Sequence, residues 1–214
     1  MDMVPANFRA ALARVPPDDR EPWIDELFGL GELPTDGPAL PPGCVPYLPC
    51  SLESLQKCLE LAAVQANDVF VDIGAGIGRV TMLAHLLTGA EAIGIEIQPA
   101  LAQMARVLVA RMKTPGVSVI EGDAAGLLPS LPRGSVFFLY CPFSGDRLER
   151  VIDDIATIAA TRTVRICTVD LPPLARPWLV PIEPPGALSG EIAVYRSLPV
   201  AGSASRGTDR IECA

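Results

Sequence analysis

The 214-residue sequence lacks any apolar run that approaches the roughly 20 residues needed to cross a bilayer. Its first residues also lack the basic region and the apolar stretch that mark a signal peptide. These two absences argue against a membrane protein and against a secreted one. We therefore expect a cytoplasmic protein that does not associate with membranes.

Clustered metal ligands are also missing. His85 is the single histidine, and the six cysteines contain no C-x-x-C pair. A structural zinc site needs four such ligands at short spacings, so we expect no metal site. His85 lies in an apolar helical stretch, where a packed histidine is the more common case than a general base. Reduced and mostly buried thiols are expected at Cys44, Cys50, Cys58, Cys141, Cys167 and Cys213.

Basic residues are too few and too scattered to form a cluster. The sequence has 17 lysines and arginines against 25 acidic residues, which gives a net charge of −8. Sequence-independent binding to a phosphate backbone depends on a basic stripe. We therefore expect no nucleic-acid partner, while the composition leaves the oligomeric state open.

Residues 1–50 differ in composition from the rest of the chain. They hold 10 of the 22 prolines, and their 8 acids against 3 arginines account for −5 of the net charge. Short helices are expected at Phe8–Val15 and at Glu21–Leu30, where Pro22 falls in the first turn. From Pro34 to Pro49 the prolines exclude regular helix and central strand. We interpret residues 1–50 as an acidic, Pro-rich arm that could act as a lid.

Alternating strand and helix patterns begin at Ser51, which can cap a helix whose leucines repeat at helical spacing. The short, Pro/Gly-rich connection between the last two expected strands indicates an antiparallel pair. We assign residues 51–200 to one domain and expect the small and polar residues of 201–214 to form a disordered tail. The expected strands are 69–73, 92–96, 117–121, 136–140, 164–169, 178–182 and 192–196, and the main expected helices are 79–88, 99–112 and 146–160.

This alternation is typical of an α/β fold with a Rossmann-like, doubly wound sheet, mostly parallel with an antiparallel last strand. Ligands of such sheets bind beyond the carboxyl ends of the strands, at the switch point beside the first strand. The loops after Ile73, Ile95, Glu121 and Tyr140 are therefore where we expect a site.

A glycine-rich turn, Asp72-Ile-Gly-Ala-Gly-Ile-Gly78, follows the first expected strand. Its glycines allow a sharp turn and a close approach to a ligand, although tight packing of strand against helix could also explain them. Two acids at further strand ends favour a ligand. Glu96, 22 residues after Gly74, could accept hydrogen bonds from both hydroxyls of a ribose. Asp123 could accept from the exocyclic amine of an adenine while Ala124 donates its amide.

Both a dinucleotide and S-adenosylmethionine (SAM) contain such a nucleoside. A dinucleotide site usually has the spacing G-x-G-x-x-G and holds a pyrophosphate at the helix N-terminus. Here the spacing is G-x-G-x-G, and Asp72 precedes the first glycine by two residues. A carboxylate there would repel a pyrophosphate but suits the ammonium group of a methionine moiety, so the charge favours SAM.

The same motifs resemble those of class I SAM-dependent methyltransferases. Val69–Arg79, Gly94–Glu96 and Gly122–Asp123 are similar to the successive cofactor motifs of that superfamily, and the resemblance covers about Tyr47 to Ser197. Within it, Tyr47-Leu-Pro-Cys-Ser51 resembles the Tyr-x-Pro-Thr/Ser segment of small protein-lysine methyltransferases. The resemblance implies a lid role for Tyr47, with packing against the sheet edge as an equal alternative. The expected cofactor-binding residues are Tyr47, Asp72, Gly74, Ala75, Gly76, Gly78, Glu96, Ile97, Asp123 and Ala124.

The loop after the fourth expected strand contains Tyr140-Cys-Pro-Phe143, where amine methyltransferases of the superfamily often have Asn-Pro-Pro-Tyr or Asn-Pro-Phe. Cys141 replaces the asparagine, so the side-chain oxygen that could accept from an amine is missing. The main-chain carbonyls of Cys141 and Pro142 remain as acceptors, and Phe143 could line the substrate slot. A reactive Cys141 is a weak alternative, because no basic cluster would lower its pKa. We take Cys141, Pro142 and Phe143 as the candidate catalytic residues.

The favoured function is methyl transfer from SAM to a nucleophile, with an amine nitrogen on a protein or small molecule as the favoured acceptor. Such a transfer needs positioning more than acid–base groups, because the sulfonium already activates the methyl group. Two alternatives stay open. One is a non-catalytic SAM-binding or regulatory module, which the departure at Cys141 would suit, and the other is a nicotinamide-dependent oxidoreductase.

Overall fold

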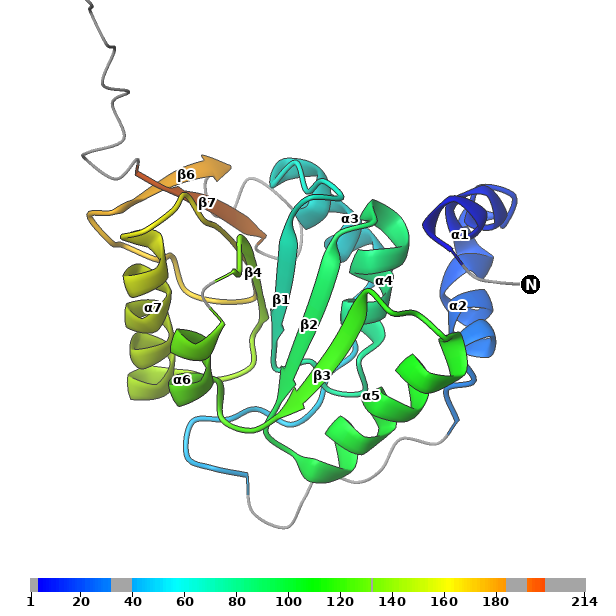
Figure 1. Cartoon of the computed structure of the whole chain (residues 1–214), viewed down its shortest axis with the longest axis horizontal. Helices are drawn as coiled ribbons and strands as arrows, with labels where there is room; N and C mark the ends of the chain where they lie inside the picture. Colours follow the sequence, from blue (N-terminus) through cyan, green and yellow to red (C-terminus); the bar gives the residue numbers. More distant parts are fainter. Residues whose placement is uncertain (1–3, 32–39, 132, 184–191, 199–214) are drawn as a thin grey trace, which may run out of the picture.

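A computed structural model describes residues 4–31, 40–131, 133–183 and 192–198 of the chain. Its strands are β1 (Val69–Ile73), β2 (Glu91–Glu96), β3 (Val117–Glu121), β4 (Val136–Tyr140), β5 (Arg165–Val169), β6 (Leu179–Glu183) and β7 (Ala193–Ser197). They form one seven-stranded sheet in the order β3-β2-β1-β4-β5-β7-β6 (Figure 1). Neighbouring strands from β1 to β5 are parallel, whereas β7 runs antiparallel to both β5 and β6. The predicted α/β fold and its antiparallel end are confirmed.

The bounds of the strands agree with the sequence-based prediction to within one residue. The agreement arises because the strands are short apolar runs between turn-forming residues, a pattern that hydrophobicity alone reveals. Residues 184–190, in the predicted connection between the last two strands, lie outside the described residues, as does the predicted tail 201–214.

The helices are α1 (Pro5–Leu12), α2 (Arg20–Phe28), α3 (Leu52–Leu61), α4 (Arg79–Thr88), α5 (Pro99–Met112), α6 (Ala124–Leu127) and α7 (Gly145–Ala159), with 3-10 turns at Pro17–Asp19 and Leu128–Ser130. α4, α5 and α7 match the prediction to within one residue. The predicted cap of α3 is also confirmed, because the Ser51 hydroxyl accepts a hydrogen bond from the Ser54 amide at 3.1 Å. α6 is not predicted by periodicity, since it has four residues and includes Gly126 at a φ of 143°.

Alternate side chains of the strands face two helical layers. Phe70 and Phe138 stack with ring centroids 5.8 Å apart and belong to the core cluster that includes residues of α3, α4 and α5. Val71 and Phe137 belong to a second cluster with residues of α7. In Figure 1 these layers lie on opposite sides of the sheet. The strands are therefore buried on both faces, as expected for parallel strands joined by helices.

The two N-terminal helices pack into the hydrophobic core. Phe8, Ile24 and Phe28 are at most 1% exposed and join the same cluster as α4. The predicted bounds of the first helix are wrong, since it begins at Pro5, where the fixed φ and missing N–H of proline suit the first turn. α2 ends at Gly29, whose left-handed φ of 64° closes the helix. The boundary at residue 50 between arm and domain stays a proposal.

Residues 40–50 differ from these helices, because they follow the carboxyl ends of the strands without forming a helix or strand. In Figure 1 this light-blue segment passes below β1, β2 and β3. Cys44 makes an isolated antiparallel bridge with Phe143, and the Val45 amide donates to the Pro142 carbonyl at 3.1 Å. The prolines predict this irregular path, although residues 34–39 lie outside the described residues.

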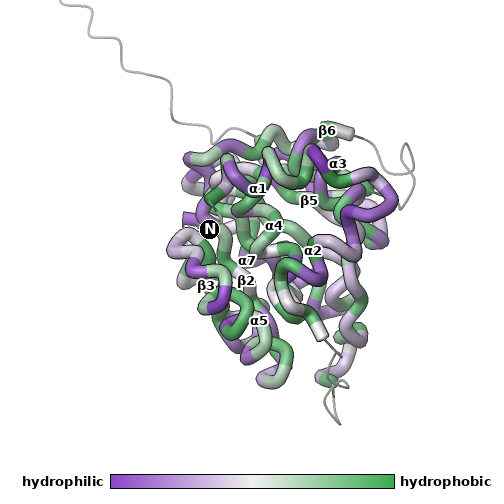
Figure 2. Tube along the Cα trace, turned by 90° about the vertical axis from the view of Figure 1, so that its right-hand side faces the viewer, coloured by the Kyte–Doolittle hydropathy of each residue, from purple (hydrophilic) through white to green (hydrophobic). Residues whose placement is uncertain are grey.

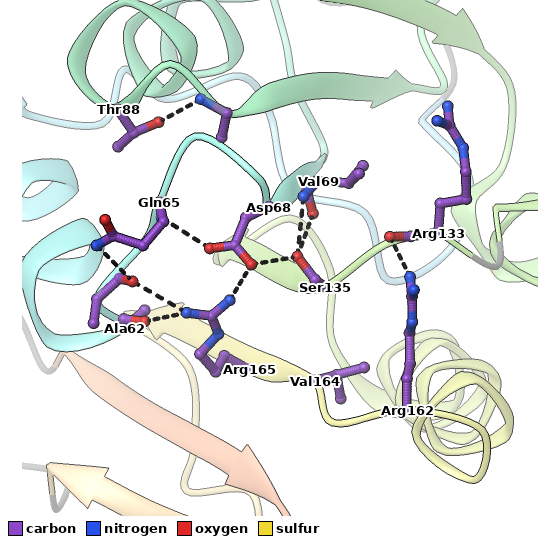
Figure 3. Close-up of polar contacts among 12 residues, drawn as sticks. Ala62, Gln65, Asp68, Val69, Thr88, Arg133, Ser135, Arg162, Val164 and Arg165 are labelled. Atoms are coloured by element: carbon purple, nitrogen blue, oxygen red, sulfur yellow. Dashed lines mark hydrogen bonds and ion pairs between the residues drawn. The ribbon is translucent and has the colours of Figure 1, made fainter.

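The opposite, amino-terminal edge of the sheet is held by a polar cluster (Figure 3). The Asp68 carboxylate accepts hydrogen bonds from the Gln65 amide and the Ser135 hydroxyl, both at 2.8 Å, and pairs with the Arg165 guanidinium. Arg165 also donates to the Ala62 carbonyl at 2.6 Å. This amino-edge cluster ties the end of α3 to the starts of β1, β4 and β5.

Hydrophobic residues concentrate in the interior of the chain. Figure 2 shows hydrophobic segments around α4, whose Met82, Leu83 and Ala84 are completely buried. No helix among the described residues is long and apolar enough to cross a membrane.

Candidate functional site

The carboxyl ends of β1 to β4 border a cavity of about 650 Å³, measured out to its open mouth. It lies at the switch point of the sheet, where the chain order reverses between β1 and β4. Leu40 and Cys44–Leu48 line it from the irregular N-terminal segment. The sequence-predicted residues that line it are Tyr47, Gly74, Glu96, Ile97, Asp123, Ala124, Cys141, Pro142 and Phe143.

The glycine loop lies close against other parts of the chain. A Cβ on Gly74 would come within 2.6 Å of the Pro142 ring, and one on Gly76 within 2.2 Å of the Tyr47 ring. Both glycines have positive φ, of 82° and 55°, which side chains rarely tolerate. Gly78 has a different role, because its missing Cβ allows α5 to approach at Ala105. Close packing against a helix therefore accounts for Gly78, whereas Gly74 borders the cavity.

Glu96 is fixed in place by backbone amides. Its carboxylate accepts hydrogen bonds from Gly76 and Gln98, each at 2.7 Å, and the residue is 5% exposed. The end of β2 thus holds a fixed carboxylate at the cavity wall, and its contact with a ribose stays a prediction.

Asp123 lies at the end of β3, on the same side of the cavity as α7. Its Oδ1 accepts a hydrogen bond from the Ala125 amide at 3.1 Å, which caps α6. Its Oδ2 pairs with the guanidinium of Arg147, from the first turn of α7. The Asp123 carboxylate is thereby held between a backbone donor and a cation.

Asp72 is placed differently from the expectation, because it lies beneath the glycine loop and does not line the cavity. Strand alternation directs it towards α4, where its Oδ2 accepts a hydrogen bond from the Thr81 hydroxyl at 2.7 Å. The residue is 3% exposed, and this burial raises the pKa of its carboxyl to about 7, against the lowering effect of Thr81. Its direct contact with an ammonium group stays a prediction.

Tyr47 covers the loop from above. Its ring lies over Gly76 and lines the cavity, and burial raises the pKa of its hydroxyl to about 12. The hydroxyl is therefore neutral and can donate a hydrogen bond at physiological pH. The lid role stays a prediction, with packing of the ring against the sheet edge as the alternative.

The acceptor loop has an unusual backbone. Cys141 adopts a left-handed φ of 44°, and its amide donates to the Val169 carbonyl at 3.1 Å. Asparagine adopts such a conformation more readily than cysteine does. The Pro142 carbonyl already accepts from the Val45 amide, which leaves the Cys141 carbonyl as the main-chain acceptor of this pair for a ligand.

Two residues that the sequence reasoning missed line the cavity, and a third, Asp170, lies beside the acceptor loop. Arg147 lines the cavity, and so does Cys44, which belongs to the irregular N-terminal segment. Asp170 follows β5 with a positive φ of 53°, close enough to raise the pKa of the Cys141 thiol by its charge, after burial. The rule that strand-end loops meet at one edge could have found Asp170, whereas nothing in the pattern marks Arg147. His85 lies apart from the cavity, where its Nδ1 is 2.7 Å from the Ala90 carbonyl oxygen.

One protein family matches part of the sequence. The family is described as histone methylation protein DOT1, and its match covers residues 47–119, about a third of the chain. The match includes the glycine loop and Glu96 but ends before Asp123 and the acceptor loop. No curated protein sequence matches the chain.

Solved structures of methyltransferases share the fold. An RNA methyltransferase from Salinibacter ruber in complex with S-adenosyl-L-homocysteine is 24% identical, with a TM-score of 0.50 over 70% of this chain and 92% of that one. A putative methyltransferase from Escherichia coli is 20% identical, with a TM-score of 0.55 over 77% and 91%. A precorrin-6y C5,15-methyltransferase from Geobacter metallireducens is 18% identical, with a TM-score of 0.52 over 72% and 92%. The chain thus has the Rossmann-like fold of class I methyltransferases.

Proposed function

We propose that this chain binds SAM and transfers its methyl group to an amine nitrogen on a protein or small molecule. The observation that carries the proposal is the meeting of Gly74, Glu96 and Asp123 in one cavity at the switch point of the sheet. The family match over residues 47–119 and the similarity to solved methyltransferases support it.

The donor set of the cavity fits the cofactor. Glu96 would accept from the ribose hydroxyls, while Asp123 and the Ala124 amide would hold an adenine at the end of β3. Gly74 allows the backbone to approach the ligand, and Tyr47 covers the loop from the other side. Asp72, beneath the loop, would contribute negative charge towards the ammonium group of the methionine moiety when its carboxyl, whose pKa is raised to about 7, is ionised.

The residues of this chain act mainly by positioning. SAM supplies a methyl group that its sulfonium already activates for in-line attack. The glycine loop and Glu96 hold the donor side, while the Tyr140–Phe143 loop forms the acceptor side. Residues 40–48 cover the cavity and reduce the access of water, as closing segments do in other enzymes.

An amine acceptor suits the groups around Cys141. The exposed carboxylate of Asp170 lies beside the acceptor loop and would attract a protonated amine before it loses its proton. The Cys141 carbonyl could then orient an N–H of the acceptor. The lack of a basic cluster favours a protein or small molecule over a nucleic acid, although one structurally similar protein is described as an RNA methyltransferase.

The proposal is tested by binding followed by transfer. Isothermal titration should detect binding of SAM and no binding of NAD. The protein is then incubated with SAM carrying a labelled methyl group and an extract of the source organism, and label is measured in the protein, small-molecule and RNA fractions. We expect label in the protein or small-molecule fraction. Binding of NAD would contradict the proposed cofactor, and binding of SAM without any transfer would indicate a binding module.

A further inference from the structure

Arg147 contributes a cation to the cavity from the first turn of α7. It is the only lysine or arginine among the described residues that line the cavity, and its side chain is 11% exposed. One guanidinium nitrogen pairs with Asp123, while its Nε is buried without a hydrogen-bond partner. No other buried side-chain nitrogen or oxygen in the described part of the chain lacks a partner.

A buried N–H without an acceptor lowers stability, so proteins rarely retain one without a reason. A guanidinium has five N–H groups, and Asp123 is the partner that the structure provides for one of them. The remaining donors beside the cavity therefore favour a ligand that carries an acceptor next to the group bound by Asp123.

Adenine has such an arrangement on one of its edges. Its N6 amine is a donor, and the neighbouring N7 is an acceptor. Asp123 and Arg147 present the complementary pair, an acceptor oxygen directly beside donor nitrogens. A base with a carbonyl in place of the N6 amine would instead bring an acceptor against the Asp123 carboxylate.

We propose that Arg147 and Asp123 together recognise this edge of the adenine, with Asp123 accepting from N6 and the Arg147 guanidinium donating to N7. The inference rests on the proposed function, since it concerns the adenine of the same cofactor. It makes Arg147 a specificity-determining residue, and it explains why the cation lies in the cavity of a chain that has few basic residues.

The test is isothermal titration of the full chain with S-adenosyl-L-homocysteine and with its 7-deaza analogue, in which a C–H replaces N7. Loss of one hydrogen bond from a charged donor should weaken binding of the analogue to the unaltered chain by about tenfold or more. Arg147→Met should bind the two ligands with equal affinity. Arg150→Met is the matched control, because Arg150 lies one turn later on the same helix, is exposed and does not line the cavity.

The outcomes separate this inference from the function on which it rests. A tenfold preference in the unaltered chain and in Arg150→Met, lost in Arg147→Met, supports the inference. Equal affinities in the unaltered chain overturn it while leaving the proposed cofactor in place, and this comparison needs no variant to fold. A full preference retained by folded Arg147→Met also overturns it. Failure of the unaltered chain to bind either ligand contradicts the proposed function itself.

Discussion

The two edges of the sheet carry buried aspartates only four residues apart, yet their surroundings are opposite. Asp68, 9% exposed, is paired with Arg165 and accepts two further hydrogen bonds. Asp72, 3% exposed, accepts a hydrogen bond from the Thr81 hydroxyl, and the pKa of its carboxyl is raised to about 7. Groups with perturbed pKa values or without partners are common at functional sites. The contrast therefore indicates that the amino edge stabilises the fold and the carboxyl edge binds the ligand.

The backbone shows the same contrast. Cys141 and Asp170 have left-handed φ at the carboxyl edge, and the unpartnered Nε of Arg147 lies there as well. The amino-edge cluster has each of its charged groups paired (Figure 3). Changes at the amino edge should therefore reduce stability, whereas changes at the carboxyl edge should alter binding or turnover.

The largest effect on stability is expected for Asp68→Ala. It removes the partner of the partly buried Arg165 and the acceptor for Gln65 and Ser135. Breaking a buried pair by removing one partner typically costs about 3–5 kcal/mol. Chemical denaturation should show this loss in the free energy of unfolding.

Glu91→Ala is the control, since Glu91 pairs with the exposed Arg133 at the surface and should change stability by less than about 1 kcal/mol. Similar losses in both variants would contradict the role assigned to the amino-edge cluster.

The second prediction concerns the pH dependence that Asp72 introduces. In the folded state the pKa of the Asp72 carboxyl is raised from 3.8 to about 7. Between these two pH values the folded state therefore keeps a proton that the unfolded state has released. The stability of the unaltered chain should therefore fall, relative to Asp72→Asn, as the pH rises from about 4 to about 7. A pKa shift of this size corresponds to a change of up to roughly 4 kcal/mol in the free energy of unfolding.

This difference is measured by denaturation of both proteins from pH 4 to pH 8. Asparagine keeps an acceptor for Thr81, so the comparison isolates the charge of Asp72. A difference in stability that does not change with pH would show that Asp72 has an ordinary pKa.

At the carboxyl edge, Glu96→Ala should weaken SAM binding by about 2–4 kcal/mol, because two hydrogen bonds between ribose hydroxyls and a charged group are lost. Glu121→Ala is the matched control. Glu121 is the register partner of Glu96 on β3, but it pairs with Arg106 and does not line the cavity. Titration calorimetry on the folded variants should show unchanged affinity for Glu121→Ala. An affinity for Glu96→Ala within twofold of the unaltered chain would exclude Glu96 from the site.

The smallest effects are expected at Cys141. Asparagine tolerates the left-handed φ of 44° better than cysteine, so Cys141→Asn should raise stability by up to about 1 kcal/mol. It should also preserve or raise the methylation rate on an amine acceptor, and Cys141→Ser should be nearly neutral. Initial rates at saturating SAM check both variants. A collapse of activity in Cys141→Ser, with fold and SAM affinity intact, would show that the sulfur takes part in the reaction.

The sequence predicted most of the fold, because apolar periodicity and strand-end residues are local signals. Glu96 and Asp123 could be assigned in the same way, since parallel strands place their carboxyl ends at one edge. The sequence could not predict α6, which is too short to show periodicity, whereas Pro5 is a first-turn signal that could have given the start of α1. Nor could it predict that Phe8 and Ile24 belong to the core, because a short amphipathic helix does not reveal its packing partner.

What the sequence determined by itself is the order of the elements, the position of the edge where the site forms and the charge of its main residues. Only the tertiary structure decided which groups meet there. It directed Asp72 beneath the glycine loop, occupied the Pro142 carbonyl with Val45 and brought Arg147 to Asp123. The physical reason is that hydrophobic patterns specify an element and its buried face. The pairing of polar groups depends instead on contacts between residues that are distant in the sequence, and those form only when the layers pack.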